Sequence, residues 1–474
     1  MSETLKRKVG LFGAVAIITG MIVGGSMYVI VPQMARAAGP SVWIAYLVAA
    51  IPALFAILYA IQLGGALPAT GGHYVLLTRL ISPLMGWVLS FGGALAVIAS
   101  NCFVAWGFAK YFYLYVPLGS LNPDTGILIY ALLIVVLFTL INWVGMQFAT
   151  WAQGLMMLLF VVGMLIFGIG GIINMKPENL TPLFPNGMDP FIEAVVIASF
   201  AWIGYMALIE IGGEIKDPRR NIPKALIISF LIVLVLYTIV PLGLVSVMKW
   251  SDITKAIENT AIYNAAGMFL PPWEVFVFIF LGAMGAFLTT VSANIMVGAR
   301  DICAWGRDGL VPTVFSRVNK KFSTPEVALL TVAVVSMAGI LVQATLDKYA
   351  LVVVMFLMLA MLVASTATWM LPRRAPDIYK HVVFKFTAFW RWFTWIGCLI
   401  SFGGTILFGF MIDLTSKQNP GAVTIVFVGL ISLAIIYWLI RKAYLKSKGV
   451  DLAKLQRELT GATLMEVEEK APEA

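Results

Sequence analysis

Charged residues are scarce in this sequence. Asp, Glu, Lys and Arg make up 12% of its 474 residues, whereas soluble proteins average about 25%. Histidine and cysteine are rarer still, with two histidines (His73 and His381) and three cysteines (Cys102, Cys303 and Cys398). No histidine stands near a cysteine or carboxylate at metal-ligand spacing, and the cysteines suggest no disulfide framework. The composition therefore argues against a soluble protein and against a membrane-embedded metalloenzyme, and we expect no metal and no other cofactor.

Apolar sequence is abundant instead. Hydrophobic residues make up 61% of the chain, and a helix needs about 20 apolar residues to cross a bilayer core. The first apolar segment is long and lacks a small-residue cleavage site, so we predict a membrane span there and not a secretory leader. Twelve segments meet or approach the required length: 11–31, 41–63, 84–108, 127–147, 151–174, 191–212, 225–247, 275–298, 326–345, 350–371, 393–414 and 423–440. We therefore expect an all-α membrane protein with twelve transmembrane helices.

The basic residues alternate with these spans. If the amino terminus faces the cytoplasm, 25 of the 32 Lys and Arg residues fall in cytoplasmic segments. The positive-inside rule then predicts a multi-pass protein of the cytoplasmic membrane with both termini in the cytoplasm. This orientation needs an even number of spans, which agrees with twelve. It also accounts for the formal net charge of +9, so we expect the lipid bilayer as a partner and no nucleic acid.

Two of the spans are interrupted by small residues at matching places. Gly24 in span 11–31 and Gly204 in span 191–212 are 180 residues apart, and four other spans separate them. Backbone that weakens a helix is tolerated in lipid only where it lines a cavity. Glycine-interrupted spans at corresponding positions of two halves indicate the substrate site of a transporter. An odd number of spans per half inverts the second half, so we expect a 5+5 inverted repeat with discontinuous helices 1 and 6, followed by helices 11 and 12.

This organisation divides the chain into five parts. They are a cytoplasmic amino terminus at 1–10, a first five-helix repeat at 11–175, a second inverted repeat at 190–372, helices 11 and 12 at 393–440, and a cytoplasmic tail at 441–474.

Several motifs follow one another along residues 10–375. Span one carries Gly24-Gly25-Ser26-Met27-Tyr28, then Pro32 and Ala38-Gly39-Pro40. The next run contains Leu63-Gly64, Pro68, Gly71-Gly72 and Tyr74, and span four leads to Asn142, Gly145 and Gln153. Span six continues into the segment 214–225, and a later loop contains Arg300, Arg307-Asp308-Gly309-Leu310-Val311-Pro312 and Thr324-Pro325. In order and spacing, these motifs resemble the amino acid–polyamine–organocation transporter family.

The resemblance implies the five-plus-five inverted-repeat fold shared with bacterial leucine transporters, and transport of amino acids or related amines. The chain departs from the family at three places. The second glycine of the family's G-S-G-I-F element falls on Ser26 or Met27, and Gln62 replaces a common acidic residue before Leu-Gly. Phe160 stands where some proton-coupled members carry a lysine.

The interrupted spans suggest how an amino acid would be held. Free N–H groups at the start of a half-helix suit a carboxylate, and freed carbonyl groups suit an ammonium. The expected donors are Gly24, Gly25 and Ser26; the expected acceptors are Ile22, Phe200, Ala201 and Ile203, with Gly204 as the matching break. The alternative is that the glycines form a helix-packing face. Trp202 is either a gate over the substrate or an aromatic residue of the core.

Three residues are candidates for ion coupling. Glu210 is the acidic residue well inside a predicted span, and such residues are costly and often functional. It could accept a proton, bind a cationic substrate group, or pair with an arginine of an inner loop. Thr289 and Thr290 could complete a sodium site with carbonyl groups of span one, or bond to helix backbone, which is the simpler explanation.

The leading hypothesis is a secondary active transporter of small neutral amino acids that works by alternating access. We expect the amino acid as partner, with exchange or proton coupling favoured over sodium. One alternative is transport of a cationic amine or polyamine that Glu210 binds. Another is a non-transporting membrane receptor or enzyme, which is disfavoured because no loop is large enough to hold a catalytic domain.

Overall fold

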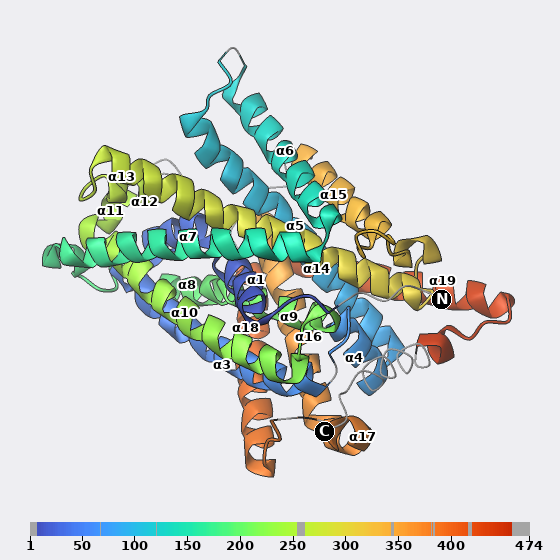
Figure 1. Cartoon of the computed structure of the whole chain (residues 1–474). Helices are drawn as coiled ribbons and strands as arrows, with labels where there is room; N and C mark the ends of the chain where they lie inside the picture. Colours follow the sequence, from blue (N-terminus) through green and yellow to red (C-terminus); the bar gives the residue numbers. More distant parts are fainter. Residues whose placement is uncertain are drawn as a thin grey trace.

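A computed structural model describes residues 7–66, 68–119, 121–253, 261–342, 346–380, 382, 384–415 and 420–456. These residues form helices and connecting segments (Figure 1), with two isolated β-bridges, Val9–Ile215 and Thr70–Ile211, and no longer strand among them. The calls made for residues 1–6 and for 457–474 in the tail lie outside the described residues.

The helices of the first half are α1 (Leu11–Val23), α2 (Ser26–Ala38), η1 (Gly39–Ser41), α3 (Val42–Ala66), α4 (Gly72–Leu80), α5 (Pro83–Tyr115), α6 (Pro123–Val144), α7 (Met146–Ile173) and η2 (Pro177–Leu180). Those of the second half are α8 (Met188–Ala201), η3 (Ile203–Met206), α9 (Ala207–Glu210), η4 (Gly212–Glu214), α10 (Pro218–Val247), α11 (Trp250–Ile253), α12 (Ala261–Ala266), α13 (Pro272–Val277), η5 (Phe278–Ala283), α14 (Met284–Arg307), η6 (Thr313–Ser316), α15 (Glu326–Leu341) and α16 (Leu346–Arg374). The chain continues with α17 (Pro376–Lys380), α18 (Ala388–Thr415) and α19 (Ala422–Ser447).

Ten helical stretches of the described chain are long and apolar enough to cross a membrane. One of them, Leu11–Gly64, joins two of the predicted spans in a single run of 54 residues. The predicted span 326–345 falls on α15, a shorter apolar helix. Each of the other nine predicted spans coincides with one long helical stretch, and the stretches Met188–Glu210 and Pro272–Arg307 each contain more than one helix. The chain is therefore a multi-pass helical membrane protein, whereas the count of twelve spans and the inverted repeat stay predictions.

Both expected helix interruptions are present. The first lies at Gly24 and Gly25, between α1 and α2, where Gly24 has a φ of +39°. The second lies between α8 and α9, where the chain turns through the short 3-10 segment η3. A Cβ atom on Gly204 would lie 2.5 Å from the backbone nitrogen of Ile22 and 2.5 Å from the carbonyl carbon of Met21. The two interruptions therefore touch through their backbones, which only glycine permits here.

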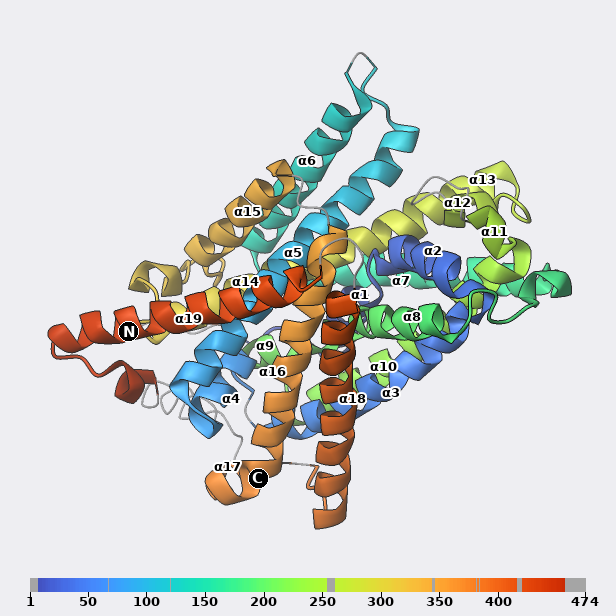
Figure 2. The same ribbon diagram turned by 180° about the vertical axis from the view of Figure 1, so that it is seen from behind.

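α1 lies at the centre of the bundle (Figure 1), and ten of its thirteen residues are buried. It packs against α7, α10 and α14, while α10 also packs along α3 and α7. α16 and α18 run side by side, and α19 extends away from them along α5 (Figure 2). α18 and α19 are the long helices with the least buried surface. The first interruption follows the buried helix α1 and touches the second, which places both in the interior of the bundle.

Candidate functional site

A cavity of about 90 Å³ lies beside the two helix interruptions. By the volume that one water occupies, this corresponds to roughly six to nine water-sized groups. Its walls come from the break between α1 and α2, from α5, from the segment α8–α9, from α14 and from α16. Most of the lining is apolar, and its polar side chains belong to Ser100, Glu210, Thr290, Asn294 and Asp301.

Most of the predicted binding residues surround this cavity. Its lining includes Ile22, Gly24, Gly25, Ala201, Gly204, Glu210 and Thr290. α2 begins at Ser26, directly after Gly25, and the first N–H groups of a helix have no partner within the helix. Donors for a carboxylate are therefore present at the cavity wall. For Ser26, Phe200 and Ile203, the placement of the side chains is not described.

Tyr237 joins the two interruptions. Its hydroxyl oxygen lies 2.6 Å from the carbonyl oxygen of Ile22 and 2.9 Å from that of Ala201. The hydroxyl has one hydrogen, so it donates to one of these carbonyl groups at a time. Two of the predicted acceptors for an ammonium thus already share a donor from α10. The sequence carried no signal for this role beyond a tyrosine within an apolar span.

Trp202 is buried. Its ring packs edge-on against Tyr237 at a centroid distance of 5.0 Å and lies tilted against Phe230 at 5.3 Å. It is not among the residues that line the cavity in the described part of the chain. In this arrangement its contacts are those of a core aromatic residue, and its role as a gate stays a prediction.

Thr289 and Thr290 do meet a carbonyl group of α1. Their hydroxyl groups donate to the carbonyl oxygen of Gly20, at 3.3 and 2.9 Å, and also lie 2.7 and 3.2 Å from the carbonyl oxygen of Ala286. Gln153 donates from its side chain to the carbonyl oxygen of Thr289 at 2.9 Å. These bonds tie α14 and α7 to the interrupted helix, as expected for hydroxyl groups that stabilise backbone.

Glu210 faces the cavity and is 6% exposed. Its Oε1 atom is hydrogen-bonded to Nδ1 of His73 at 2.7 Å. Asp301, which is 5% exposed, lines the same cavity and interacts electrostatically with Glu210. Glu210 therefore has a histidine and a second carboxyl group as neighbours, and no ion pair between Glu210 and an arginine is found among the described residues.

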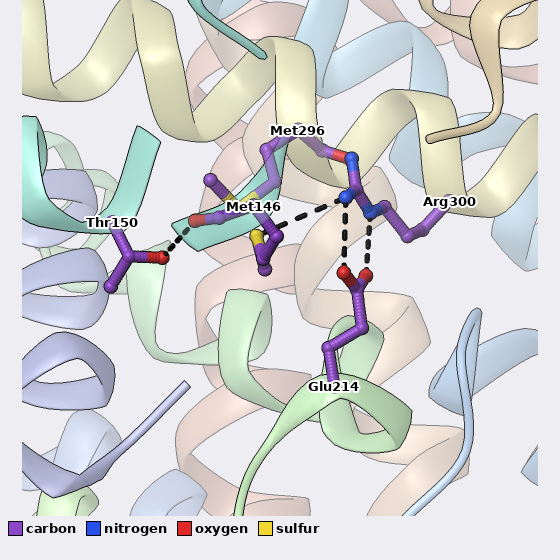
Figure 3. A network of polar contacts seen from close by, with 5 residues as sticks. All are labelled: Met146, Thr150, Glu214, Met296 and Arg300. Carbon is purple, nitrogen blue, oxygen red and sulfur yellow. Dashed lines mark hydrogen bonds and ion pairs between the residues drawn. The ribbon is translucent and has the colours of Figure 1, made fainter. Parts of the chain in front are cut away.

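Arg300 forms a buried ion pair with Glu214, which is near Glu210 in the chain (Figure 3). The guanidinium group donates from Nε to Oε1 of Glu214 at 2.8 Å and from Nη2 to Oε2 at 3.3 Å. Nη1 donates to the carbonyl oxygen of Met296 at 3.2 Å, and the sulfur of Met146 lies 3.9 Å from Nη2. Both charged side chains are 1% exposed. The pair is thus a buried link between α14 and η4.

His73 and Asp301 are the polar residues of this region that the sequence did not point to. His73 is 137 residues from Glu210, so no local spacing could connect them. Asp301 was missed because the predicted span ended at residue 298, whereas α14 continues to Arg307. Asp301 lies six residues before the end of α14 and would have counted as intramembrane if the span had been drawn to its full length.

Comparison with known proteins points to one family. A model of the amino acid permease family matches residues 9–440. The branched-chain amino acid permease BcaP of Bacillus subtilis is 27% identical over 394 residues, which cover 79% of this chain and 83% of that protein. The methylthioribose transporter of the same organism is 29% identical over 395 residues, covering 80% and 84%. The large neutral amino acids transporter small subunit 2 of Oryctolagus cuniculus is 25% identical over 364 residues, covering 73% and 66%.

Proposed function

Because the chain belongs to the amino acid permease family, we propose that it carries small neutral amino acids across the cytoplasmic membrane as a secondary active transporter. Both termini face the cytoplasm, and the substrate site is exposed to one side of the membrane at a time. The observation that carries this proposal is the cavity at the meeting point of the two helix interruptions, lined by Gly24, Gly25, Ala201 and Gly204.

The polar and apolar parts of the cavity match the parts of an amino acid. The carboxylate is placed at the first N–H groups of α2, next to Gly25. The ammonium is placed toward the carbonyl groups of Ile22 and Ala201, each of which keeps a lone pair beside its contact with Tyr237. The side chain then meets apolar lining such as Val104, which suits an uncharged substrate. The branched-chain and large neutral amino acid relatives support this class.

Alternating access in this proposal moves the two five-helix repeats, 11–175 and 190–372, against each other. An aromatic cluster stands beside the cavity, formed by Tyr28, Tyr111, Phe278 and Phe287, with centroid distances of 6.0 Å from Tyr28 to each of the other three. A Cβ atom on Gly25 or on Gly107 would overlap the Phe287 ring. We place the gate on the side away from Glu210 at this cluster, and Trp202 remains a candidate for a second gate.

For coupling, we favour exchange or proton movement over sodium. The hydroxyl groups of Thr289 and Thr290 already donate to backbone carbonyl groups, which accounts for both residues without an ion. Counterflow and net uptake under imposed pH and sodium gradients test this preference. Strict sodium dependence that disappears in Thr290→Ala would overturn it.

Transport of a cationic amine or polyamine is the second candidate function. It is favoured by the two carboxyl groups, Glu210 and Asp301, that line the cavity. The methylthioribose transporter is as similar to this chain as the amino acid permease is, so family membership alone leaves the substrate open. A non-transporting receptor or enzyme is the third candidate, and the named relatives, which are all transporters, give it no support.

Counterflow of a labelled panel into proteoliposomes separates these candidates. The panel contains small neutral, branched-chain, aromatic and cationic amino acids, a polyamine, and methylthioribose. We expect saturable counterflow of neutral amino acids, with the cationic compounds much weaker. A preference for the amines would favour the second candidate function, and no counterflow of any member would contradict the transporter.

The place of the site can be tested with a pair of glycines. Gly204→Ala puts a methyl group against the backbone of α1, and neither backbone can move aside cheaply. Gly93 also lines the cavity, but a Cβ atom there would meet nothing within 4 Å. We expect Gly204→Ala to lose substrate binding and counterflow, and Gly93→Ala to retain both. Equal activity of the two variants would show that the site is misplaced.

A further inference from the structure

Three titratable side chains from three separate segments meet at one end of the cavity. They are His73 of α4, Glu210 of α9 and Asp301 of α14, and they are 4%, 6% and 5% exposed. His73 Nδ1 lies 2.7 Å from Glu210 Oε1, and the carboxyl groups of Glu210 and Asp301 interact. Glu210 and Asp301 both line the cavity that holds the proposed substrate site. The cluster is therefore buried from bulk solvent but continuous with the transport path.

Each member of the cluster has a buried atom that finds no hydrogen-bond partner among the described residues. These atoms are Oε2 of Glu210, Oδ1 of Asp301 and Nε2 of His73. Buried polar atoms are normally paired, because an unpaired one costs the free energy of its lost hydration. Unpaired carboxylate oxygens at a cavity wall thus point to a ligand that binds there.

The charge of the surroundings defines that ligand. α1, α3, α4, η3, η4 and α14 pack against α9. Besides His73 and Asp301, these elements carry Tyr59, which interacts with Glu210, Tyr205, which interacts with Tyr59, and the pair of Glu214 and Arg300. Glu214 and Arg300 neutralise each other, and the tyrosines are neutral. In the described part of the chain, His73 is therefore the one group that could offset the two carboxylates, and it supplies at most one positive charge.

Two ionised carboxyl groups in contact inside an apolar environment are strongly disfavoured. One further positive charge must therefore be bound. A proton needs a single oxygen atom, whereas hard divalent cations take six or more oxygen ligands, and the cluster offers two unpaired carboxylate oxygens.

We propose that Glu210 and Asp301 together bind one proton at the end of the substrate cavity, that His73 holds Glu210 in position, and that this proton crosses the membrane in the same direction as the substrate. This inference rests on the proposed transport function. The proton comes from water on one side, forms an O–H bond with a carboxylate oxygen, and returns to water when that bond breaks on the other side. No other bond is made or broken.

Coupling follows from the shared cavity. Glu210 and Asp301, which we call the carboxyl dyad, occupy one cavity with the substrate. A change of access therefore exposes the dyad and the substrate to the same side. The protonated dyad moves together with the zwitterionic substrate. After both have left, the dyad returns empty and ionised, and the hydrogen bond between His73 and Glu210 stabilises its charge during that step.

Proton movement during transport is the direct test. Wild-type protein is reconstituted with a pH-sensitive dye inside the vesicles, and the amino acid that gives the fastest counterflow is added outside. We expect acidification of the lumen. The accumulation ratio should rise about tenfold for each unit of imposed pH gradient, because one proton per substrate contributes a factor of ten. Counterflow without acidification and without pH-driven accumulation would overturn the inference, whereas absence of counterflow would contradict the proposed function instead.

Variants then assign the proton to the dyad. Glu210→Gln and Asp301→Asn remove a titratable oxygen with little change of shape. We expect both to lose lumen acidification and pH-driven accumulation while counterflow, which needs no net proton movement, persists. The matched control is Glu193→Gln, an exposed carboxylate on the same span as Glu210, which should retain all three activities. Acidification that survives in Glu210→Gln, Asp301→Asn and their combination would overturn the inference.

A variant that loses counterflow as well is replaced by Glu210→Asp or Asp301→Glu, which keep a carboxyl group. Counterflow that returns together with acidification supports the dyad, and counterflow that returns without it contradicts the dyad.

His73 is tested as a positioning residue. His73→Ala removes the hydrogen bond to Glu210, and His73→Asn returns an amide group near the place of Nδ1. We expect the pH profile of net uptake to shift to higher pH in His73→Ala, because ionised Glu210 loses a partner, and to return toward wild type in His73→Asn. A pH profile that is the same in all three proteins would contradict this role, since a purely structural residue changes the amount of active protein and not the profile.

Discussion

Asp308 is a buried carboxyl group at the end of a helix. It follows Arg307, the last residue of α14, and is 6% exposed. Burial raises the pKa of Asp308 to about 7, against the opposing effects of a hydrogen bond with Tyr74 and of the charge of Arg307. A residue of the Arg-Asp-Gly motif in the sequence thus helps to pack α14 against α4, and it titrates near neutral pH.

Removal of this carboxyl group should change the pH dependence of stability. The pKa of an unfolded aspartate is about 3.9, so folded protein binds more protons between about pH 4 and pH 7, and the free energy of unfolding falls as pH rises through that window. Because asparagine does not titrate, the free energy of unfolding of Asp308→Asn does not fall in this way as pH rises. We expect the free energy of unfolding of the variant to match the wild type near pH 4 and to exceed it by as much as about 4 kcal/mol at pH 8, which raises the unfolding temperature. Thermal unfolding in detergent measures the difference.

The exposed Asp189 provides the control for this series, because Asp189→Asn should follow the wild type at every pH. A gap between Asp308→Asn and wild type that stays constant from pH 4 to pH 8 would contradict the assignment.

The residues that the sequence could identify are those whose signal is local. Gly24, Gly25 and Gly204 stand out because glycine within an apolar span has few explanations, and all three line the cavity. Tyr237 and His73 could not be identified, because their contacts join residues 215 and 137 positions apart. Long-range contacts of this kind are set by how helices pack, which a single sequence does not specify.

At the scale of helices and their connections, the Arg300–Glu214 pair is the best-defined link in the second half of the chain. It joins α14 to η4, and the backbone of Glu214 also accepts hydrogen bonds from the N–H groups of Lys8 and Val9. The chain before α1 is thereby held next to the end of the interrupted segment α8–α9. Breaking one partner of a buried ion pair leaves an uncompensated charge, which costs about 3–5 kcal/mol, while apolar replacement of both is often tolerated.

Substitutions at this pair should therefore be strongly non-additive. Glu214→Leu and Arg300→Met are each expected to lower the free energy of unfolding by about 3–5 kcal/mol, and the double variant to recover a large part of that loss. Thermal unfolding of the wild type, the two single variants and the double variant in detergent provides this double-mutant cycle. The control is Asp377→Asn in the exposed pair with Lys380, at 3.6 Å, where about 0–1 kcal/mol is expected. A double variant as unstable as the sum of the single ones would exclude the pairing.

The sequence predicted the elements better than their limits. The apolar segments identified the long helices because lipid requires continuous helix. The end of span eight was placed too early because Arg300 and Asp301 were treated as loop residues, whereas the ion pair with Glu214 allows the charged turn to continue as buried helix. Likewise, α1, α2 and α3 form one nearly continuous helical stretch, since η1 connects α2 to α3 with no polar loop.

At the scale of the whole molecule, the carboxyl-terminal segment covers part of α4. After α19, the chain returns to α4, where Leu452 is fully buried and the Gln456 side chain donates to the Tyr74 hydroxyl group at 2.9 Å. Figure 2 shows this last described turn beside α4. Tyr437 and Arg441 of α19 bind the carbonyl groups of Leu310 and Gly309 at 2.8 and 3.0 Å. Part of the segment predicted as a tail therefore packs against the rest of the protein.

Two truncations should separate the docked segment from the rest of the tail. A chain that ends at Gly449 loses Leu452, worth about 1.5–3 kcal/mol when fully buried, and the bond from Gln456, worth about 0.5–1.5 kcal/mol. A chain that ends at Gln456 keeps every contact described for this segment. We expect the first to unfold at a clearly lower temperature in detergent and the second to match the full chain. Identical unfolding of both truncated proteins would show that the docked segment adds no stability.

The return of Gln456 to Tyr74 also bears on the order of assembly. The two residues are separated by 382 positions, so the ribosome has made nearly the whole chain before this contact can form. During synthesis α4 enters the growing bundle without its cover, and the cover arrives last. A nascent chain that stalls after α19 would keep the Tyr74 face of α4 open to chaperones and proteases, whereas a finished chain hides it. The contact between Gln456 and Tyr74 can therefore form only after α19 has been synthesised.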